Sequence, residues 1–164
     1  MSRSAISKTE PRTPPKPRVE VQYVFRRDGV PAKAVITKWA RAALEHGGNM
    51  ELVVRIVGEG ESADLNRRYR RRTGPTNVLS FSYAGTEERQ MAPGLLGDIV
   101  ICAPVVAREA RERGVDPRAH WAHMVVHGIM HLRGYDHIHA RDARIMEQME
   151  SRIMGRLGFA DPYA

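Results

Sequence analysis

Three histidines in the run His127-Gly-Ile-Met-His131-Leu-Arg-Gly134-Tyr-Asp-His137 constrain the fold more than any other stretch of the 164-residue chain. If the residues up to Leu132 are helical, His127 and His131 project from one face, with Cβ atoms roughly 5–6 Å apart. Gly134 can take a positive φ without steric cost, so it can end the helix and reverse the chain. His137 would then approach from the far side of the turn. We therefore predict a helix with two imidazoles, a turn, and a third imidazole facing them.

Three neutral imidazoles with no fourth ligand in the run are typical of a catalytic zinc site, in which one coordination position stays open. The spacing matches the zinc run H-E-x-x-H-x-x-G-x-x-H of metzincin peptidases. However, Gly128 stands where those enzymes carry the glutamate that serves as general base. The sequence therefore predicts His127, His131 and His137 as metal ligands, while the missing glutamate disfavours a peptidase.

The composition is that of an ordinary soluble protein, with 27% charged and 42% hydrophobic residues. The one cysteine, Cys102, excludes an internal disulfide framework and a cysteine-rich zinc site. It is consistent with the reducing cytoplasm, where we expect the protein. No apolar run approaches the roughly 20 residues of a membrane helix, and the N-terminus lacks the apolar region of a secretory signal. We therefore expect neither a membrane association nor export.

Residues 1–17 are expected to form a disordered, basic, proline-rich extension, and residues 18–164 a single metal-dependent domain. Four prolines stand among Ser, Thr, Lys and Arg in this extension, so burial of apolar surface cannot offset its ordering entropy. Residues 1–18 hold +4 of the net charge of +7, which leaves +3 for the remainder. The basicity of the chain is thus partly a property of the extension, and it is only modest support for a nucleic-acid partner.

Hydrophobic periodicity predicts about four strands and five helices. Alternating or continuous apolar runs predict strands over residues 19–25, 50–57, 78–83 and 96–102. Helical stripes are predicted from Pro31 to Gly47, from Ser62 to Arg70, from Pro104 to Gly114, from Pro117 to Leu132 and from His139 to Leu157. Residues 84–95 are expected to form a loop. The order of elements indicates a small mixed sheet covered by helices, with the histidine helix at the centre.

The start of the histidine helix has its own signal. Asp116 is a good N-cap, and Pro117 is favoured at the first helical position because its missing N–H would be unpaired there anyway. The helix predicted from these two residues carries four of the seven histidines.

A second feature is the arginine-rich segment at residues 67–72, which places five guanidinium groups within six positions. Consecutive arginines point in all directions around a helix, so we expect two or three to serve a site and the others to be solvated. Arginine suits planar, bidentate contacts with phosphate. The segment indicates a phosphate-bearing ligand, but it does not show whether that ligand lies near the metal.

Four blocks occur in a specific order: LNRRYR at residues 65–70, PTNVLSF at 75–81, GDIVI at 97–101 and the histidine run at 127–137. In this combination the chain resembles the YbeY family of bacterial metal-dependent endoribonucleases. With the closing LGFADPY, the resemblance covers about residues 19–163. It implies an α+β, zincin-like fold and one Zn²⁺ on His127, His131 and His137. It also implies a catalytic arginine at Arg70, the end of the Asn-x-x-Tyr-Arg block.

The resemblance further implies a zinc-dependent endoribonuclease specific for single-stranded RNA. It would act in ribosomal RNA processing, at the 3′ end of 16S rRNA, and in ribosome quality control, with the small ribosomal subunit and assembly factors as partners. Zinc lowers the pKa of a bound water from 15.7 toward about 7, and Arg70 could stabilise charge on the phosphate oxygens. Two other hypotheses stay open, a zinc metallopeptidase and a ribosome-assembly factor whose metal is structural.

Some polar residues allow two interpretations. Asp136 is interpreted as structural rather than catalytic, and His139 as the start of the last helix rather than an additional ligand. Asp98 could bond a ligand or end its strand. Ordinary core or surface positions are predicted for two histidines and two aromatic residues that could otherwise bind metal or stack on bases: His120, His123, Trp121 and Tyr135.

Overall fold

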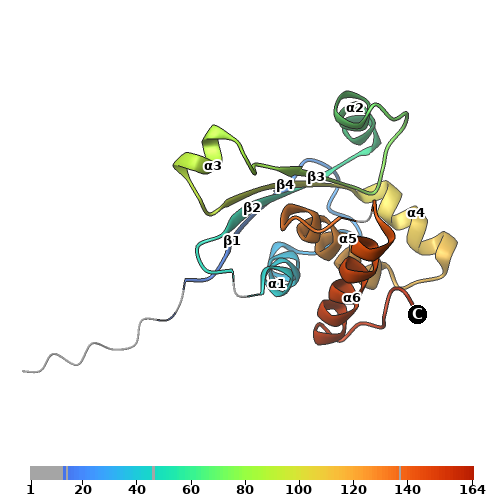
Figure 1. Ribbon diagram of the computed structural model, residues 1–164. Coiled ribbons are helices and arrows are strands. Elements are labelled where there is room, and N and C mark those ends of the chain that lie inside the picture. Colours follow the sequence, from blue (N-terminus) through green and yellow to red (C-terminus); the bar gives the residue numbers. More distant parts are fainter. Residues whose placement is uncertain (1–12, 14, 46, 137) are drawn as a thin grey trace, which may run out of the picture.

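The computed structural model describes residues 13, 15–45, 47–136 and 138–164, and in this part of the chain it contains four strands and six helices (Figure 1). The strands are β1 (Arg18–Tyr23), β2 (Glu51–Val57), β3 (Val78–Ser82) and β4 (Leu95–Cys102). The helices are α1 (Lys33–Leu44), α2 (Glu59–Arg70), α3 (Glu87–Met91), α4 (Ala103–Arg113), α5 (Pro117–Leu132) and α6 (Ala140–Arg156). The predicted α+β class is confirmed. Most of the predicted N-terminal extension and His137 lie outside the described residues.

The four strands form one mixed sheet in the order β1-β2-β4-β3. Strands β1, β2 and β4 are parallel, and β3 pairs antiparallel with β4 at the edge. Successive side chains of a strand point to opposite faces. In β2 this places Leu52, Val54 and Ile56 in the main core, whereas Val53 and Arg55 lie partly buried on the other face.

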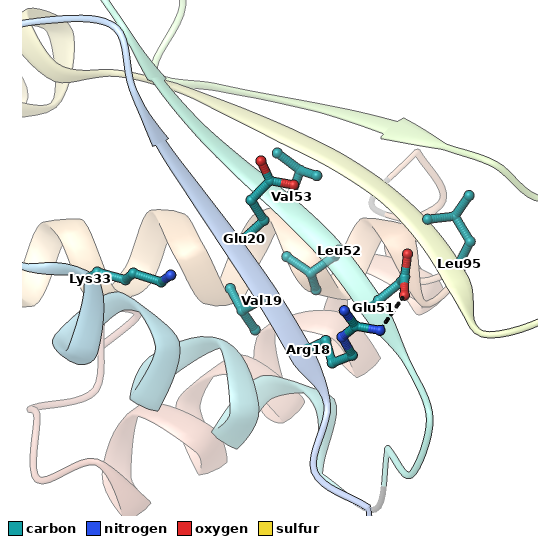
Figure 2. A pocket seen from close by; sticks show the side chains of 8 residues that line it. All are labelled: Arg18, Val19, Glu20, Lys33, Glu51, Leu52, Val53 and Leu95. Carbon is teal, nitrogen blue, oxygen red and sulfur yellow. Dashed lines mark ion pairs between the residues drawn. The ribbon is translucent and has the colours of Figure 1, made fainter.

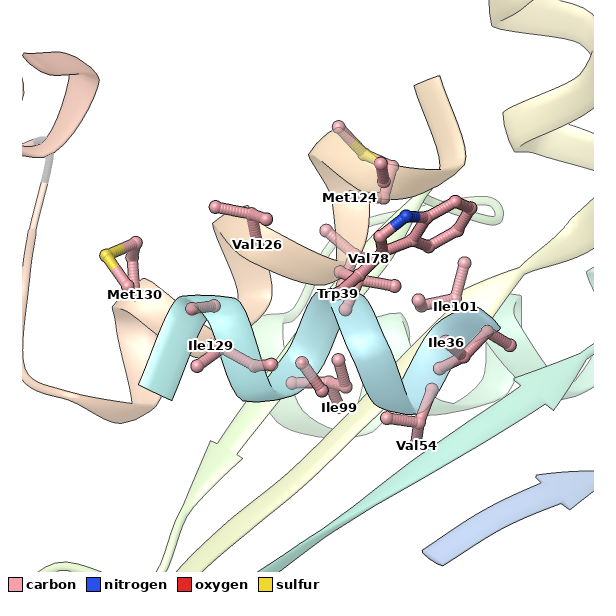
Figure 3. Close-up of a cluster of buried hydrophobic side chains, with 14 of the residues drawn as sticks. Ile36, Trp39, Val54, Val78, Ile99, Ile101, Met124, Val126, Ile129 and Met130 are labelled. Atoms are coloured by element: carbon pink, nitrogen blue, oxygen red, sulfur yellow. The ribbon is translucent and has the colours of Figure 1, made fainter. Parts of the chain in front are cut away.

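Helix α5 lies at the centre of the molecule, packed against α1, α4, α6, β3 and β4. Figure 3 shows its side chains, with Ile129 among them, meeting Trp39 of α1 and Ile99 of β4. A Cβ atom at Gly128 would lie 3.0 Å from the Cγ2 atom of Ile99, so the glycine allows the helix to approach the sheet closely. The Ser80 hydroxyl of β3 donates to the Gly128 carbonyl at 2.9 Å. The predicted central position of the histidine helix is confirmed.

A smaller apolar cluster lies on the other face of the sheet. Val57, Leu79 and Val100 pack there with Cys102 and Val105, and Leu65 of α2 adds to it. Figure 1 shows α2 on the opposite side of the sheet from α1, α5 and α6. The two faces are therefore covered unequally, and the face with α2 stays partly open.

Several element boundaries differ from the predicted ones. Helix α1 begins at Lys33 and not at Pro31, because residue 32 is extended and the Pro31 carbonyl accepts a hydrogen bond from the Tyr23 hydroxyl at 2.8 Å. Helix α2 begins at Glu59 and not at Ser62, with two glutamates in the first turn, where they complement the helix dipole. The predicted loop at residues 84–95 contains the short helix α3. Its N-cap is Thr86, whose hydroxyl accepts from the Arg89 amide.

Candidate metal centre

The structure brings together two of the three predicted ligands. The Nε2 atoms of His127 and His131 lie 3.2 Å apart, and their ring centroids are separated by 4.7 Å. Two nitrogens that each lie about 2.0–2.1 Å from one tetrahedral zinc ion are roughly 3.3–3.4 Å apart. The chemistry and the spacing of this donor pair therefore fit a shared metal ion, as the i, i+4 spacing predicts.

The turn after α5 has the predicted form. Gly134 has φ +93°, and its amide donates to the His131 carbonyl at 3.0 Å. The Tyr135 amide donates to the Met130 carbonyl at 3.0 Å, which completes a Schellman motif. Asp136 then accepts a hydrogen bond from the Ile138 amide at 2.9 Å, and its structural role stays a prediction.

His137, the third predicted ligand, lies outside the described residues, so its role stays a prediction. The chain does reverse at Gly134, as that prediction requires.

Behind His127 lies a carboxylate that the sequence analysis missed. Glu150 of α6 is fully buried, and its Oε1 atom lies 2.5 Å from the Nδ1 atom of His127. Its Oε2 atom lies 3.0 Å from the Nε2 atom of His123 and accepts a hydrogen bond from the Tyr163 hydroxyl. Ligand atoms of His123, His127 and Glu150 all lie within 4.8 Å of one another, so this group could also hold a metal ion.

Burial and hydrogen bonds act in opposite directions on the pKa of Glu150. Burial alone would raise the pKa of Glu150, but hydrogen bonds from His123, His127 and Tyr163 outweigh it and lower the pKa to about 2. Burial, together with the Glu150 carboxylate, raises the pKa of Tyr163 above its ordinary value. At neutral pH the cluster therefore holds an ionised carboxylate next to a phenol that keeps its proton.

A sequence signal for Glu150 existed. On α6, Glu150 follows Met146 by four residues and precedes Ile153 and Met154 by three and four, and all three of these are buried. Residues at these spacings share one face of a helix. A glutamate in the middle of an apolar stripe is a candidate for a buried, functional carboxylate, because glutamate is almost never fully buried unless paired.

The two remaining histidines of α5 differ in role. His120 is 3% exposed and lies 3.1 Å from the Glu109 carboxylate through Nε2, so the predicted ordinary core role is confirmed. For His123 that interpretation was incomplete, because His123 belongs to the Glu150 cluster.

Arg70, the predicted catalytic residue, is the last residue of α2 and is exposed. Arg67 and Arg68 form ion pairs with Asp64, whereas within the described part of the chain Arg70 forms none. Figure 1 shows α2 on the opposite side of the sheet from α5. Its role in catalysis stays a prediction.

The other residues with two interpretations are resolved by their contacts. Asp98 lies in the interior of β4 and accepts from the Tyr83 hydroxyl at 2.9 Å, so it does not end its strand. Trp121 is 2% exposed and Tyr135 packs against the main core, which confirms packing for both. His139 is the exposed N-cap of α6, at the predicted start of that helix.

Two of the surface hollows bear on where a ligand could approach the histidines. One, of about 290 Å³, lies at the start of β1 and β2 beside the exposed pair of Arg18 and Glu51 (Figure 2), and no histidine lines it. The other, of about 530 Å³, lies between the α4–α5 turn and the C-terminal segment and is lined by His120 and His123. Only the second adjoins the histidine cluster.

Residues 26–158 match the family model described as Endoribonuclease YbeY. The chain is 50% identical over 155 residues to a protein of that name from Alkalilimnicola ehrlichii, covering 88% of this chain and 90% of that protein. A relative of the same name from Methylococcus capsulatus is 55% identical over 134 residues, covering 82% and 87% of the two chains. A third, from Thiobacillus denitrificans, is 48% identical over 150 residues, covering 91% and 97%.

The fold is also similar to the solution structure of a protein from Thermotoga maritima. The TM-score is 0.54 at 24% sequence identity, and the alignment covers 89% of this chain and 97% of the other. This similarity concerns the fold alone. Among the described residues no helix is both long enough and apolar enough to cross a membrane.

Proposed function

This chain belongs to the Endoribonuclease YbeY family, and we propose that it is a metal-dependent endoribonuclease that cleaves single-stranded RNA. The observation that carries the proposal is the facing pair of Nε2 atoms on His127 and His131, 3.2 Å apart, in a chain of this family. The family supplies the reaction class, and the histidine pair supplies the chemistry that such a reaction needs.

We propose His127, His131 and His137 as the protein ligands of one Zn²⁺. Zinc supplies a Lewis acid that polarises a phosphoryl oxygen and lowers the pKa of a bound water. The protein's part is to hold two imidazoles at a fixed separation on a rigid helix and to bring the third from the far side of the Gly134 turn. Imidazole also suits nickel and other late transition metals, so metal identity is part of the test.

We propose Arg70 as a residue that stabilises negative charge on the phosphate. Arg70, Arg71 and Arg72 are exposed and form no ion pair within the described part of the chain, so their guanidinium groups can meet phosphate. Tyr69 is 65% exposed and stands edge-on to Phe81 with ring centroids 5.2 Å apart. Exposed aromatic rings beside arginines are a common surface for single-stranded nucleic acid.

We further propose ribosomal RNA as the substrate, including the 3′ end of 16S rRNA, with the small ribosomal subunit and assembly factors as partners in the cytoplasm. The family resemblance supports this part of the proposal.

The peptidase alternative is further disfavoured by the surroundings of Gly128. A Cβ atom there would lie 3.0 Å from Ile99 and 3.2 Å from Val78, so the position faces the sheet and has no room for a glutamate.

The decisive experiment combines elemental analysis with cleavage of a labelled single-stranded oligoribonucleotide. Wild type is expected to contain one zinc per chain and to cut internally, and His131→Ala to lose both properties together. Arg70→Ala is expected to keep its zinc and to cut about 100- to 1,000-fold more slowly, the usual cost of losing one charge-stabilising donor. Joint loss of zinc and cleavage in His131→Ala separates the enzyme from a contaminating ribonuclease.

Two matched variants serve as controls. His139→Ala removes the exposed histidine at the start of α6, and Arg67→Ala removes an exposed arginine of α2. Both are expected to keep zinc and cleavage. Chelator-sensitive peptide turnover without RNA cleavage would instead support the peptidase. Unfolding on metal removal, without RNA cleavage by the wild type, would support a structural metal.

A further inference from the structure

Burying the Glu150 carboxylate costs free energy that a purely structural side chain at this position would not need to cost. Its side chain is fully buried between α5 and α6, on a stripe of α6 that otherwise buries Met146, Ile153 and Met154. An ionised carboxylate is expensive to remove from water unless hydrogen bonds compensate. Within the described residues its side-chain partners are His123, His127 and Tyr163, and no lysine or arginine pairs with it. An apolar side chain would pack there more cheaply, so the carboxylate requires another explanation.

The contacts of His127 supply that explanation, because its two nitrogens face different partners. Nδ1 lies 2.5 Å from Glu150, on the buried side, and Nε2 lies 3.2 Å from the Nε2 atom of His131, on the other side. A carboxylate that accepts the Nδ1–H proton selects the tautomer whose lone pair is on Nε2. It also fixes the rotation of the ring, as carboxylates behind zinc-binding histidines do.

This arrangement separates the two possible cation positions. The Nδ1 atom of His127 lies 2.5 Å from the Glu150 carboxylate, so a cation held through this nitrogen by His123, His127 and Glu150 would displace that hydrogen bond. His123 presents Nε2 to Glu150 and to the Tyr163 hydroxyl, at 3.0 Å and 3.3 Å. The Nδ1 atom of His127 and the Nε2 atom of His123 both contact the Glu150 carboxylate. The Nε2 side of His127 is therefore the better position for a metal.

The C-terminal segment closes the cluster from outside. After α6, Gly158 has φ +87°, and the Phe159 amide donates to the Met154 carbonyl at 3.0 Å, so the chain turns back. Asp161 accepts hydrogen bonds from the Ser151 hydroxyl at 2.7 Å and from the Tyr163 amide at 2.9 Å. These contacts direct the Tyr163 hydroxyl onto Glu150 and stack its ring edge-on against His123, with centroids 5.4 Å apart.

We propose that Glu150 is the positioning residue of the metal centre, which orients His127 through Nδ1, and that Tyr163 holds Glu150 in place, so that the C-terminal segment is a structural part of the site. The inference rests on the proposed metal-binding function but extends it to a residue outside the histidine run. It assigns no contact with RNA to either Glu150 or Tyr163.

The test measures Zn²⁺ affinity by competition with a chromogenic chelator, using the full chain. Glu150→Gln keeps the shape of the side chain but removes the charge that holds the Nδ1–H proton. It is expected to bind Zn²⁺ about 10- to 100-fold more weakly, the usual effect of losing a carboxylate behind a zinc ligand. Tyr163→Phe removes only the supporting hydroxyl and is expected to weaken binding by less than about tenfold. Glu147→Gln changes an exposed glutamate of the same helix and should match wild type.

A second measurement distinguishes positioning from mere support of the fold. Long-range ¹H–¹⁵N spectra of the imidazole rings report which nitrogen carries the proton. In wild type, His127 is expected to be protonated at Nδ1, and in Glu150→Gln this preference should be lost while circular dichroism stays native. If Glu150→Gln does not fold, Tyr163→Phe carries the test, because Tyr163 lies at the partly exposed end of the chain.

The outcomes separate this inference from the proposed function. Wild-type zinc affinity in both Glu150→Gln and Tyr163→Phe, with RNA cleavage intact, would overturn the inference alone. Weakened zinc binding in these variants, with no RNA cleavage by wild type, would support the inference and overturn the enzyme. Abolished binding in His123→Ala with normal binding in His131→Ala would place the cation on Glu150 itself and overturn the inference.

Discussion

Two of the carboxylate–histidine contacts on helix α5, His120 with Glu109 and His127 with Glu150, differ in which partner is turned toward solvent. In the first, the His120 side chain is 3% exposed and the Glu109 side chain 20% exposed. In the second, Glu150 is fully buried and His127 is 24% exposed. The order of the two groups is therefore reversed, with the histidine innermost near the start of the helix and the carboxylate innermost toward its end.

The partners of the two carboxylates give this reversal a meaning. Glu109 also accepts from the Asn77 side chain at 3.0 Å and lies 3.6 Å from Arg113, so this contact ties α4 and α5 to the start of β3. Glu150 instead supports an imidazole whose far nitrogen faces another histidine. We infer from this difference that the buried His120 and the partly exposed Glu109 stabilise the fold, whereas the buried Glu150 behind the partly exposed His127 serves a site.

The largest expected difference between the two contacts is in metal binding. Because losing a carboxylate behind a ligand costs about 10- to 100-fold in affinity, losing the ligand in His127→Asn should weaken Zn²⁺ binding more than about 100-fold. His120→Asn should leave it within about threefold of wild type. Chelator competition on both variants measures this, and an equal loss in the two would contradict the comparison.

The second difference is in stability. His120→Ala leaves a cavity and removes one buried partner of Glu109, so we expect a loss of about 2–4 kcal/mol in the free energy of unfolding. Urea denaturation measures it. Arg113→Ala is the matched control, because this exposed partner of Glu109 should contribute less than about 1 kcal/mol. Well below the unfolding transition, His120→Ala should still bind zinc, and loss of zinc from a folded variant would argue against a purely structural contact.

Local signals in the sequence predicted much of the fold and part of the site. Asp116 does cap α5, accepting from the Arg118 amide at 2.9 Å, and Gly134 does reverse the chain. The i, i+4 spacing of His127 and His131 predicted their facing nitrogens, because a helix fixes that geometry within two turns. These features depend on neighbours in the chain, which is why the sequence alone was sufficient.

The features that were missed depend on contacts between distant segments. The antiparallel edge position of β3 consists in its pairing with β4, from Val78 opposite Ile101 to Ser82 opposite Gly97. Glu150 meets His127 across 23 residues, and Tyr163 meets His123 across 40. The apolar stripe around Glu150 could have predicted that its side chain is buried. No local sequence pattern predicts that His127 is its partner. The same limit explains why α2 and Arg70 could not be placed relative to the histidines.

The smallest expected effect is a dependence of stability on pH that belongs to the His120 contact. Burial lowers the pKa of His120 below its ordinary value of 6.5. As the pH falls below about 6.5, the unfolded chain takes up a proton that the folded chain resists, so stability is full above this pH and is lost below it. Burial alone would raise the pKa of Glu109, but hydrogen bonds from His120 and Asn77 hold it below 4.5, so its contribution is lost only at lower pH.

The window between pH 6.5 and pH 5 therefore isolates His120 from Glu109. The slope attributable to one such group is at most about 1.4 kcal/mol per pH unit. His120→Gln keeps a side-chain donor for Glu109 but cannot titrate, so the free energy of unfolding of wild type minus that of His120→Gln should fall as the pH is lowered through this window. Both proteins are measured at the same metal loading, so that pH-dependent zinc binding cancels in the difference. A difference that is flat between pH 7 and pH 5 would show that His120 has the same pKa in the folded and unfolded chain. The contact between His120 and Glu109 would then lack the electrostatic character by which we distinguish it from the contact between His127 and Glu150.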